Sequence, residues 1–147
     1  LILDEPISAL DVSIQAQILN LLVDLRQQYG FAAIFITHDL SIVRWFSDRV
    51  AVLYLGRVVE SALADIIFEK SRHPYTKALS LSKLDTNVHK KEFFSLQGEI
   101  PSPINVPSGC PFAPRCDRVV PQCTASFPPI TKTGKDVFFH CYNPLEV

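Results

Sequence analysis

Two acidic residues and one histidine are the side chains in the first part of the sequence that are best suited to chemistry. Asp4 and Glu5 follow the apolar run Leu1–Leu3, and His38 follows a second apolar run, Ala32–Ile36. Ligands of α/β proteins bind where parallel strands reach their carboxyl ends, so we expect these three side chains at one edge of a sheet. The pattern predicts a polar site there, although an acidic pair after a strand is also typical of an ordinary solvated turn.

Four cysteines form the second chemically reactive group. They are separated by five, six and 17 residues and lie in a region that also holds nine of the 11 prolines: Cys110, Cys116, Cys123 and Cys141. Four thiolates suit tetrahedral Zn²⁺ or an iron–sulfur cluster. The spacing lacks the Cys-x2-Cys pair common in structural zinc sites, and unligated thiols or a disulfide formed in air are the other interpretations. His140 is a minor alternative ligand and is more typical of a surface position.

The elements that must position the acidic pair and the histidine form a β-α-β unit. Apolar residues recur at helical spacing between Ile14 and Leu25, Asp11 is placed to cap this helix, and Gly30 is placed to end it. Both flanking apolar runs are continuous, as in buried strands of a parallel sheet. Further along we expect a short helix, a hairpin that closes the sheet, and two more helices, at residues 40–46, 49–60, 62–68 and 75–84.

The composition limits the classes of partner. The 147 residues are 48% hydrophobic and 20% charged with a formal net charge of −1, values typical of a globular domain. A nucleic-acid partner therefore has no electrostatic support. The longest apolar runs are about six residues, well short of the roughly 20 that a membrane-spanning helix needs. The chain contains no Met, and we expect it to be a piece of a longer protein.

Three short segments together resemble the ATP-binding subunits of ABC transporters. Leu1–Pro6 is similar to the Walker B strand with its glutamate, Ser8–Asp11 to the D-loop, and Thr37–Asp39 to the loop that carries the switch histidine. The resemblance implies a P-loop NTPase fold that binds ATP and Mg²⁺.

The resemblance also implies a role for each of these residues. Asp4 would serve the Mg²⁺ ion and Glu5 would orient the attacking water, two tasks that phosphoryl transfer to water requires. His38 would contact the γ-phosphate. Ser8 and Asp11 would reach the nucleotide site of a second ATPase subunit across a dimer interface.

A phosphate-binding loop does not accompany these segments. The sequence lacks the pattern Gly-x4-Gly-Lys-Ser/Thr, whose amides and lysine cradle the phosphates, and it lacks the Leu-Ser-Gly-Gly-Gln signature of the family. In the family both motifs precede the Walker B strand, so the resemblance covers only the C-terminal part of such a subunit. We therefore expect the chain by itself to be inactive as an ATPase.

The second half of the sequence narrows the resemblance. Four segments occur in the order found in the oligopeptide, dipeptide and nickel importer ATPases: Tyr54–Glu60, Arg72–Leu79, Gly98–Pro103 and Gly109–Cys116. The resemblance implies that the protein works in the reducing cytosol, where a stable disulfide is unfavourable. It also implies a [4Fe-4S] cluster on the four cysteines, with Zn²⁺ as the alternative. We expect such a group to be structural rather than redox-active, because it would tie together a loop-rich segment.

The predicted fold is α/β, the C-terminal part of a P-loop NTPase parallel sheet with helices, followed by a loop-rich extension with four cysteines. We place the ATPase part at residues 1–84 and the extension at 85–147. The implied function is that of an ATP-hydrolysing subunit of a peptide importer at the cytoplasmic face of the membrane. A second ATPase subunit and permease subunits are the expected partners, with a substrate-binding protein as an indirect one. The alternatives are a metal-stabilised docking or regulatory remnant without ATPase activity, and a nickel importer ATPase.

Overall fold

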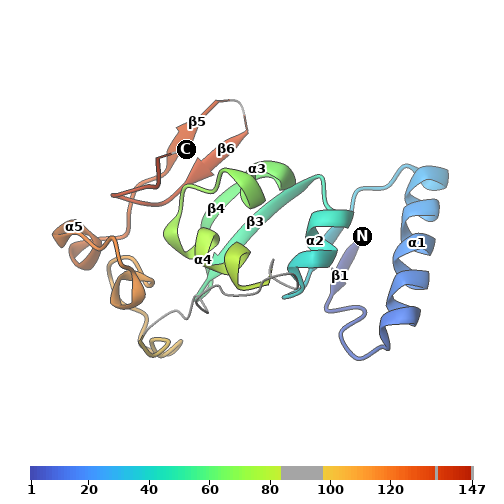
Figure 1. Cartoon of the computed structure of the whole chain (residues 1–147), viewed down its shortest axis with the longest axis horizontal. Helices are drawn as coiled ribbons and strands as arrows, with labels where there is room; N and C mark the ends of the chain where they lie inside the picture. Colours follow the sequence, from blue (N-terminus) through green and yellow to red (C-terminus); the bar gives the residue numbers. More distant parts are fainter. Residues whose placement is uncertain (84–97, 135, 147) are drawn as a thin grey trace, which may run out of the picture. The chain divides into compact units, whose positions relative to one another are not determined.

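The chain is a mixed α/β protein with two compact units, Leu1–Ser47 and Asp48–Val147 (Figure 1). The computed structural model describes residues 1–83, 98–134 and 136–146. The first unit contains β1 (Ile2–Asp4), α1 (Val12–Tyr29), β2 (Ile34–Ile36) and α2 (Leu40–Phe46). The second contains β3 (Arg49–Tyr54), β4 (Arg57–Leu63), α3 (Ala64–Glu69), α4 (Pro74–Lys83), the 3₁₀ turn η1 (Ala113–Arg115), α5 (Pro121–Ala125), β5 (Thr131–Thr133) and β6 (Val137–Phe139).

Two short parallel strands carry the first unit. β1 and β2 pair with Ile2 opposite Ile34 and Asp4 opposite Ile36. Side chains alternate between the two faces of a strand, and on the face shared by Ile2, Ile34 and Ile36 these residues are 72%, 61% and 47% exposed. Phe35, which points to the other face, is half-buried. The small sheet therefore has one covered face and one bare apolar face.

Helix α1 links the two strands and completes the β-α-β unit. It ends at Gly30, whose left-handed φ of 65° suits a residue without a side chain. Asp11 occupies the capping position at the start, but its side chain makes no capping hydrogen bond. Its carbonyl oxygen instead accepts from the amides of Ile14 and Gln15, both at 2.9 Å. The prediction that Asp11 precedes the helix is confirmed, whereas a side-chain cap is absent.

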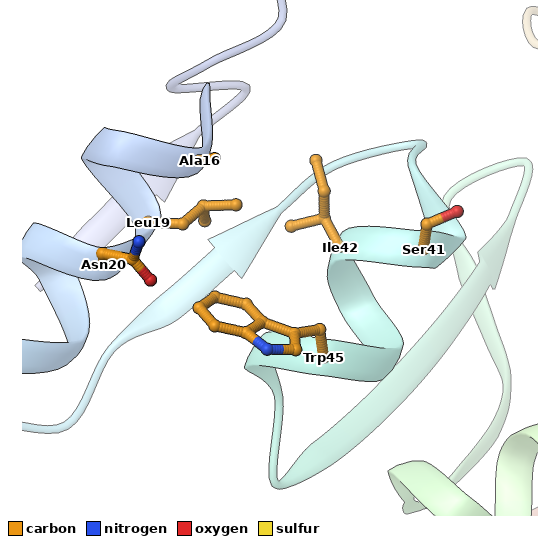
Figure 2. A pocket seen from close by; sticks show the side chains of 6 residues that line it. All are labelled: Ala16, Leu19, Asn20, Ser41, Ile42 and Trp45. Carbon is orange, nitrogen blue, oxygen red and sulfur yellow. The ribbon is translucent and has the colours of Figure 1, made fainter. Parts of the chain in front are cut away.

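An apolar hollow of about 240 Å³ lies between α1 and α2 (Figure 2). Its lining consists of Ala16, Leu19, Asn20, Ser41, Ile42 and Trp45. Trp45 is 59% exposed at its border, and its ring stacks against that of Phe46 at 6.4 Å. Phe46 in turn lies 5.1 Å from the ring of Phe35. Helix α2 is therefore held to the sheet through Phe46, while Trp45 remains largely open to solvent.

An antiparallel sheet with strand order β3-β4-β6-β5 forms the centre of the second unit (Figure 1). β3 and β4 are joined by the two-residue turn Leu55–Gly56, in which both φ angles are positive, at 47° and 75°. Turns of this kind match the twist of a hairpin. β6 then pairs with β4, with Glu60 opposite Phe139, and β5 pairs with β6.

The core of the second unit lies around Phe112, which is 1% exposed. Its ring contacts those of Tyr54 and Tyr75, with centroids 5.4 and 5.3 Å away. Val59 of β4 and Ile67 of α3 complete this core and are 0% and 1% exposed. Each such side chain contributes about 1.5–3 kcal/mol on burial. Phe112 precedes η1, so the core joins the hairpin and α4 to the cysteine-containing segment.

Most of the expected elements of residues 1–83 are present with small shifts at their ends. The strand expected to end at residue 60 continues to Leu63, and the following helices begin at Ala64 and Pro74. The prediction that the hairpin closes the sheet of β1 and β2 is wrong for the described residues, because β3 and β4 belong to a separate sheet that β6 extends. The predicted boundary between residues 84 and 85 lies outside the described residues and stays a prediction.

Candidate functional site

The carboxyl ends of β1 and β2 bring Glu5 and His38 together. Nδ1 of His38 lies 2.8 Å from Oε1 of Glu5. The His38 side chain is 77% exposed and that of Glu5 39%. The second carboxylate oxygen of Glu5, Oε2, is buried and has no hydrogen-bond partner among the described residues. A buried oxygen of this kind is suited to accept from a ligand, and the imidazole beside it can donate or accept a proton.

The backbone of Glu5 is in an unusual conformation. Its φ of 45° lies in the left-handed region, which disfavours residues with a side chain. The amide of Glu5 donates to the carbonyl of Ile36 at 3.0 Å, and the Glu5 carbonyl accepts from the amide and the hydroxyl of Ser8 at 3.3 and 3.0 Å. These bonds from both sides hold the strained residue with its carboxylate towards His38. Strain of this type is common at functional sites.

The other amino-terminal candidates surround this pair. Asp4 is exposed at the end of β1, and Ser8 and Asp11 are exposed on the loop that leads to α1. The side-chain amide of Gln15 donates to the carbonyls of Ile7 and Leu10, at 3.1 and 3.0 Å, and so braces this loop against the helix. The structure thus connects Ser8 directly to Glu5, and places Asp4 and Asp11 at the two ends of the same segment.

The four cysteines gather in the second unit as free thiols. Cys110 and Cys123 are buried, and Cys116 and Cys141 are half-buried. Burial raises the pKa of the Cys141 thiol to about 11, and the charges of the other three thiols act in the same direction. Burial likewise raises the pKa of Cys116, with further contributions from Cys110 and Cys123. Since the pKa of Cys141 responds to the other three thiols, we call these four residues the thiol cluster.

A close backbone contact joins two members of the thiol cluster. The amide of Cys110 donates to the carbonyl of Cys123 at 2.7 Å. Gly109 makes this approach possible, because a Cβ at that position would lie 2.2 Å from the Cys123 carbonyl oxygen and 2.9 Å from the carbonyl carbon of Thr124. Only a residue without a side chain fits there.

Backbone amides near three of the four thiols favour their ionised form. Those of Phe112 and Ala113 partly offset the rise in the pKa of Cys110 that burial causes. The amide of Arg118 has the same effect on the pKa of Cys116, and the amide of Asn143 on that of Cys141. Amide hydrogen bonds to sulfur favour the thiolate, and they are one of the features by which proteins tune thiolate-bound metal groups.

A compact site for a single metal ion is not preformed. Within residues 1–83, 98–134 and 136–146, no group of three or more His, Cys, Asp or Glu residues is arranged to hold a metal ion. Tetrahedral zinc would require sulfur atoms roughly 3.8 Å apart, so the thiols would have to move together. The donor set itself, four free thiols, fits the chemistry of a thiophilic group. His140, the minor alternative ligand, uses its Nδ1 atom in a hydrogen bond of 2.8 Å with the carbonyl oxygen of Pro128.

Sequence reasoning missed a buried carboxylate next to the expected helix start. Glu60 is 0% exposed, and its two carboxylate oxygens accept from the amides of Arg72 at 2.6 Å and His73 at 3.0 Å. Burial raises the pKa of Glu60, and the two amide bonds oppose this. The available signal was an acidic residue directly after Val58 and Val59 in the expected strand.

His73 is the second buried ionisable residue of this region. It is 1% exposed, and its Nδ1 accepts from the amide of Tyr75 at 3.1 Å, which caps the start of α4. Burial lowers the pKa of His73 to about 4, with a smaller contribution from His140. His73 is therefore neutral at physiological pH, and its role is structural.

Comparison with known proteins shows which proteins the chain is similar to. Residues 59–123 match the family described as "Oligopeptide/dipeptide transporter, C-terminal region". The chain is 49% identical over 147 residues to a probable peptide ABC transporter ATP-binding protein of Sinorhizobium fredii, a match that covers 98% of the chain and 42% of the relative. It is 44% identical over 142 residues to the dipeptide transport ATP-binding protein of Haemophilus influenzae, a match that covers 95% of the chain and 43% of the relative. It is 48% identical over 134 residues to the dipeptide transport ATP-binding protein of Escherichia coli, which covers 90% of the chain and 40% of the relative.

The similarity extends along nearly the whole chain, although the chain spans only about two fifths of the length of these relatives. The resemblance drawn from the motifs is thus confirmed. The chain is similar to the C-terminal region of the ATP-binding proteins of oligopeptide and dipeptide ABC transporters.

Proposed function

We propose that the chain is the C-terminal part of an ATP-hydrolysing subunit that energises an ABC importer of peptides. The observation that carries the proposal is the contact between Glu5 and His38 at the carboxyl ends of two paired parallel strands. The carboxyl ends of parallel strands are the position at which α/β proteins bind ligands. The names of the relatives support ATP as the bound nucleotide and favour peptides over nickel as the cargo.

The proposed roles follow the geometry of this edge. Glu5 orients the attacking water through its Oε2, which has no hydrogen-bond partner in the described part of the chain, and His38 contacts the γ-phosphate. Bound Mg²⁺ neutralises charge on the phosphates, and the exposed Asp4 is the residue that would hold it. Ser8 and Asp11 reach towards a second ATPase subunit, and their loop is exposed as such a contact requires.

The partners and location follow from the same proposal. A second ATPase subunit completes the two nucleotide sites, permease subunits are driven by closure of the dimer, and a substrate-binding protein delivers the cargo indirectly. None of the helices in the described part of the chain has the length and apolar character needed to cross a lipid bilayer. In this proposal, which rests on the names of the relatives, the chain is part of a peripheral subunit at the cytoplasmic face of the membrane.

Complementation tests this proposal. The chain alone is expected to bind Mg-ATP weakly and not to hydrolyse it, because its sequence contains no phosphate-binding loop. Mixed with the remaining, amino-terminal part of the Escherichia coli relative, it is expected to restore ATP hydrolysis. Glu5→Gln should lower that restored rate at least about 100-fold, the usual contribution of a positioned proton acceptor.

The control for this experiment is Glu99→Gln, which changes an exposed acidic residue of the second unit in the same way. Its rate should equal that of the wild type. Hydrolysis that persists in Glu5→Gln would remove Glu5 from the chemistry. Absence of hydrolysis with every amino-terminal partner would favour the alternative of a docking or regulatory remnant.

We also propose that the thiol cluster holds a metal group, an iron–sulfur cluster in preference to zinc. The support is that the other three thiols act on the pKa of Cys141, and that nearby backbone amides oppose the rise in pKa that burial causes at Cys110, Cys116 and Cys141. An iron–sulfur cluster spreads its ligands over several iron atoms and so suits thiols that are not gathered around one point. Bound metal would stabilise four thiolates and tie η1, α5 and the C-terminal segment together.

Purification without oxygen, followed by iron, sulfide and zinc analysis, tests the metal proposal. Iron and sulfide in a fixed ratio to protein would support it, and zinc alone would favour the alternative ion. Variants with Cys116→Ser and Cys141→Ser should lose the metal. A wild-type chain that contains none of the three elements would overturn the proposal and leave unligated thiols.

A further inference from the structure

Arg118 and Asn143 make a reciprocal contact between two segments that lie far apart in the sequence. Nη2 of Arg118 donates to Oδ1 of Asn143 at 3.1 Å, and Nδ2 of Asn143 donates to the carbonyl of Arg118 at 3.1 Å. Two longer bonds, both 3.4 Å, run from Arg118 to the carbonyls of Asn143 and Pro144. Both side chains are half-buried. We call this pair of residues the clasp.

Each residue of the clasp lies two positions after a cysteine, Arg118 after Cys116 and Asn143 after Cys141. The side chains of the clasp therefore tie together the two peptide segments that carry these cysteines.

Regular secondary structure does not hold this half of the thiol cluster. Cys116 follows η1 and Cys141 follows β6, and neither lies in a helix or strand. Cys110 and Cys123 are held differently, through their own backbone bond of 2.7 Å and the tight fit of Gly109. The thiol cluster is thus built from two pairs, each fixed by its own contact.

We propose that the clasp is the device that holds Cys116 and Cys141 at the thiol cluster before any group binds. The second step of this proposal, which rests on the metal proposal above, is that the clasp thereby determines how well this half of the thiol cluster retains a thiophilic metal group. Arg118 and Asn143 are positioning residues in this sense, since they act through the cysteines.

The chemistry of the two side chains explains why they suit this task. The guanidinium of Arg118 is a rigid fork of several donors and reaches three acceptors, whereas a lysine in its place would offer one point charge. The Asn143 amide both donates and accepts, so an aspartate could keep the bond from Arg118 but not the bond to its carbonyl.

Pulsed alkylation of the reduced 147-residue chain, read cysteine by cysteine by mass spectrometry, tests the clasp. In Arg118→Lys and in Asn143→Leu, the iodoacetamide reaction rates of Cys116 and Cys141 should rise about tenfold, because a pair of hydrogen bonds is lost. The rates of Cys110 and Cys123 should change less than about twofold. The double variant should be no faster than either single variant, since both remove the same contact.

Arg49→Lys is the matched control, because the Arg49 side chain bonds to the carbonyl and the carboxylate of Asp136 rather than to Arg118 or Asn143. It should leave all four rates unchanged. An equal rise at all four cysteines in Arg118→Lys would show general loosening and overturn the proposal. No rise at Cys116 and Cys141 would overturn it as well.

A measurement of metal retention distinguishes failure of the clasp proposal from failure of the metal proposal, on which the second step rests. The reduced chain is loaded without oxygen, with Fe²⁺ and sulfide in one sample and Zn²⁺ alone in another, and bound metal is measured after gel filtration. Lower retention in Arg118→Lys than in Arg49→Lys supports the second step, and equal retention overturns it. If the wild-type chain binds neither, the metal proposal and the second step fail, and the alkylation rates alone decide whether the clasp exists.

Discussion

At the scale of single residues, the buried His73 links the stability of the second unit to pH. Its pKa falls from 6.5 in the unfolded chain to about 4 in the folded one, chiefly because burial disfavours the charged imidazole. The folded state therefore binds fewer protons than the unfolded state between these values. Stability contributed by neutral His73 is complete above pH 6.5 and is lost as the pH falls towards 4, by roughly 3 kcal/mol in all.

We expect His73→Asn to remove this pH dependence and keep the cap, because the asparagine oxygen can accept from the amide of Tyr75. Between pH 7.5 and pH 5 the wild type should lose about 2 kcal/mol more than the variant in the free energy of unfolding. Urea denaturation at the two pH values measures the difference. Glu60, whose pKa burial raises, acts in the opposite direction in both proteins and cancels in the comparison. Identical pH dependence in the two proteins would contradict the prediction.

At the scale of elements, the junction between Gly109 and α5 controls how the cysteine-containing segment packs. A Cβ on residue 109 would collide with the backbone of Cys123 and Thr124, and backbone atoms cannot rotate away as a flexible side chain can. The bond between the Cys110 amide and the Cys123 carbonyl must then lengthen or break.

Gly109→Ala is expected to destabilise the chain by about 2–4 kcal/mol, since it combines overpacking with the loss of a buried hydrogen bond. Gly134→Ala is the matched control. Gly134 has a left-handed φ of 68° but open space around it, so only the conformational cost of about 1 kcal/mol applies. Thermal unfolding of both variants gives the comparison, and equal midpoints would refute the steric argument.

The elements of the first half could be predicted because their signals are local. The spacing of Ile14 to Leu25 and the stop at Gly30 depend on neighbours in the sequence, and α1 follows them. The pairing of β4 with β6 could not be predicted in this way, because β6 is only Val137–Phe139 and its partner is distant.

The same difference between local and distant signals applies to the sites. Glu5 and His38 both follow apolar strands and were expected together, whereas the carboxylate of Glu60 and the Arg118–Asn143 contact depend on tertiary packing.

At the scale of the whole molecule, the bare apolar face of the first unit presents three large apolar side chains to solvent. Ile2, Ile34 and Ile36 share one face of the β1–β2 pair with Asp4, and all are exposed. Apolar faces of this kind drive association, and unpaired strand edges beside them add to it.

The isolated chain is therefore expected to self-associate at micromolar concentration. The double substitution Ile34→Lys with Ile36→Lys should shift it towards the monomer, because two charges oppose burial of the face. Sedimentation velocity over a range of concentrations measures the shift. Ile104→Lys, at a position that is 89% exposed in the second unit, is the control and should leave association unchanged. Monomeric behaviour of the wild type at all concentrations would contradict this expectation.

The order of the strands β3, β4 and β6 has a consequence for how the second unit folds. The β3–β4 hairpin joins neighbouring residues and can form early, but Glu60 must wait for Phe139, which is made much later in synthesis. Contacts between distant residues close slowly because a long loop must be ordered first. During that interval β4 is an open edge with its buried acid still in water. A ribosome that pauses before residue 137 would hold a nascent chain that has its hairpin and lacks its third strand.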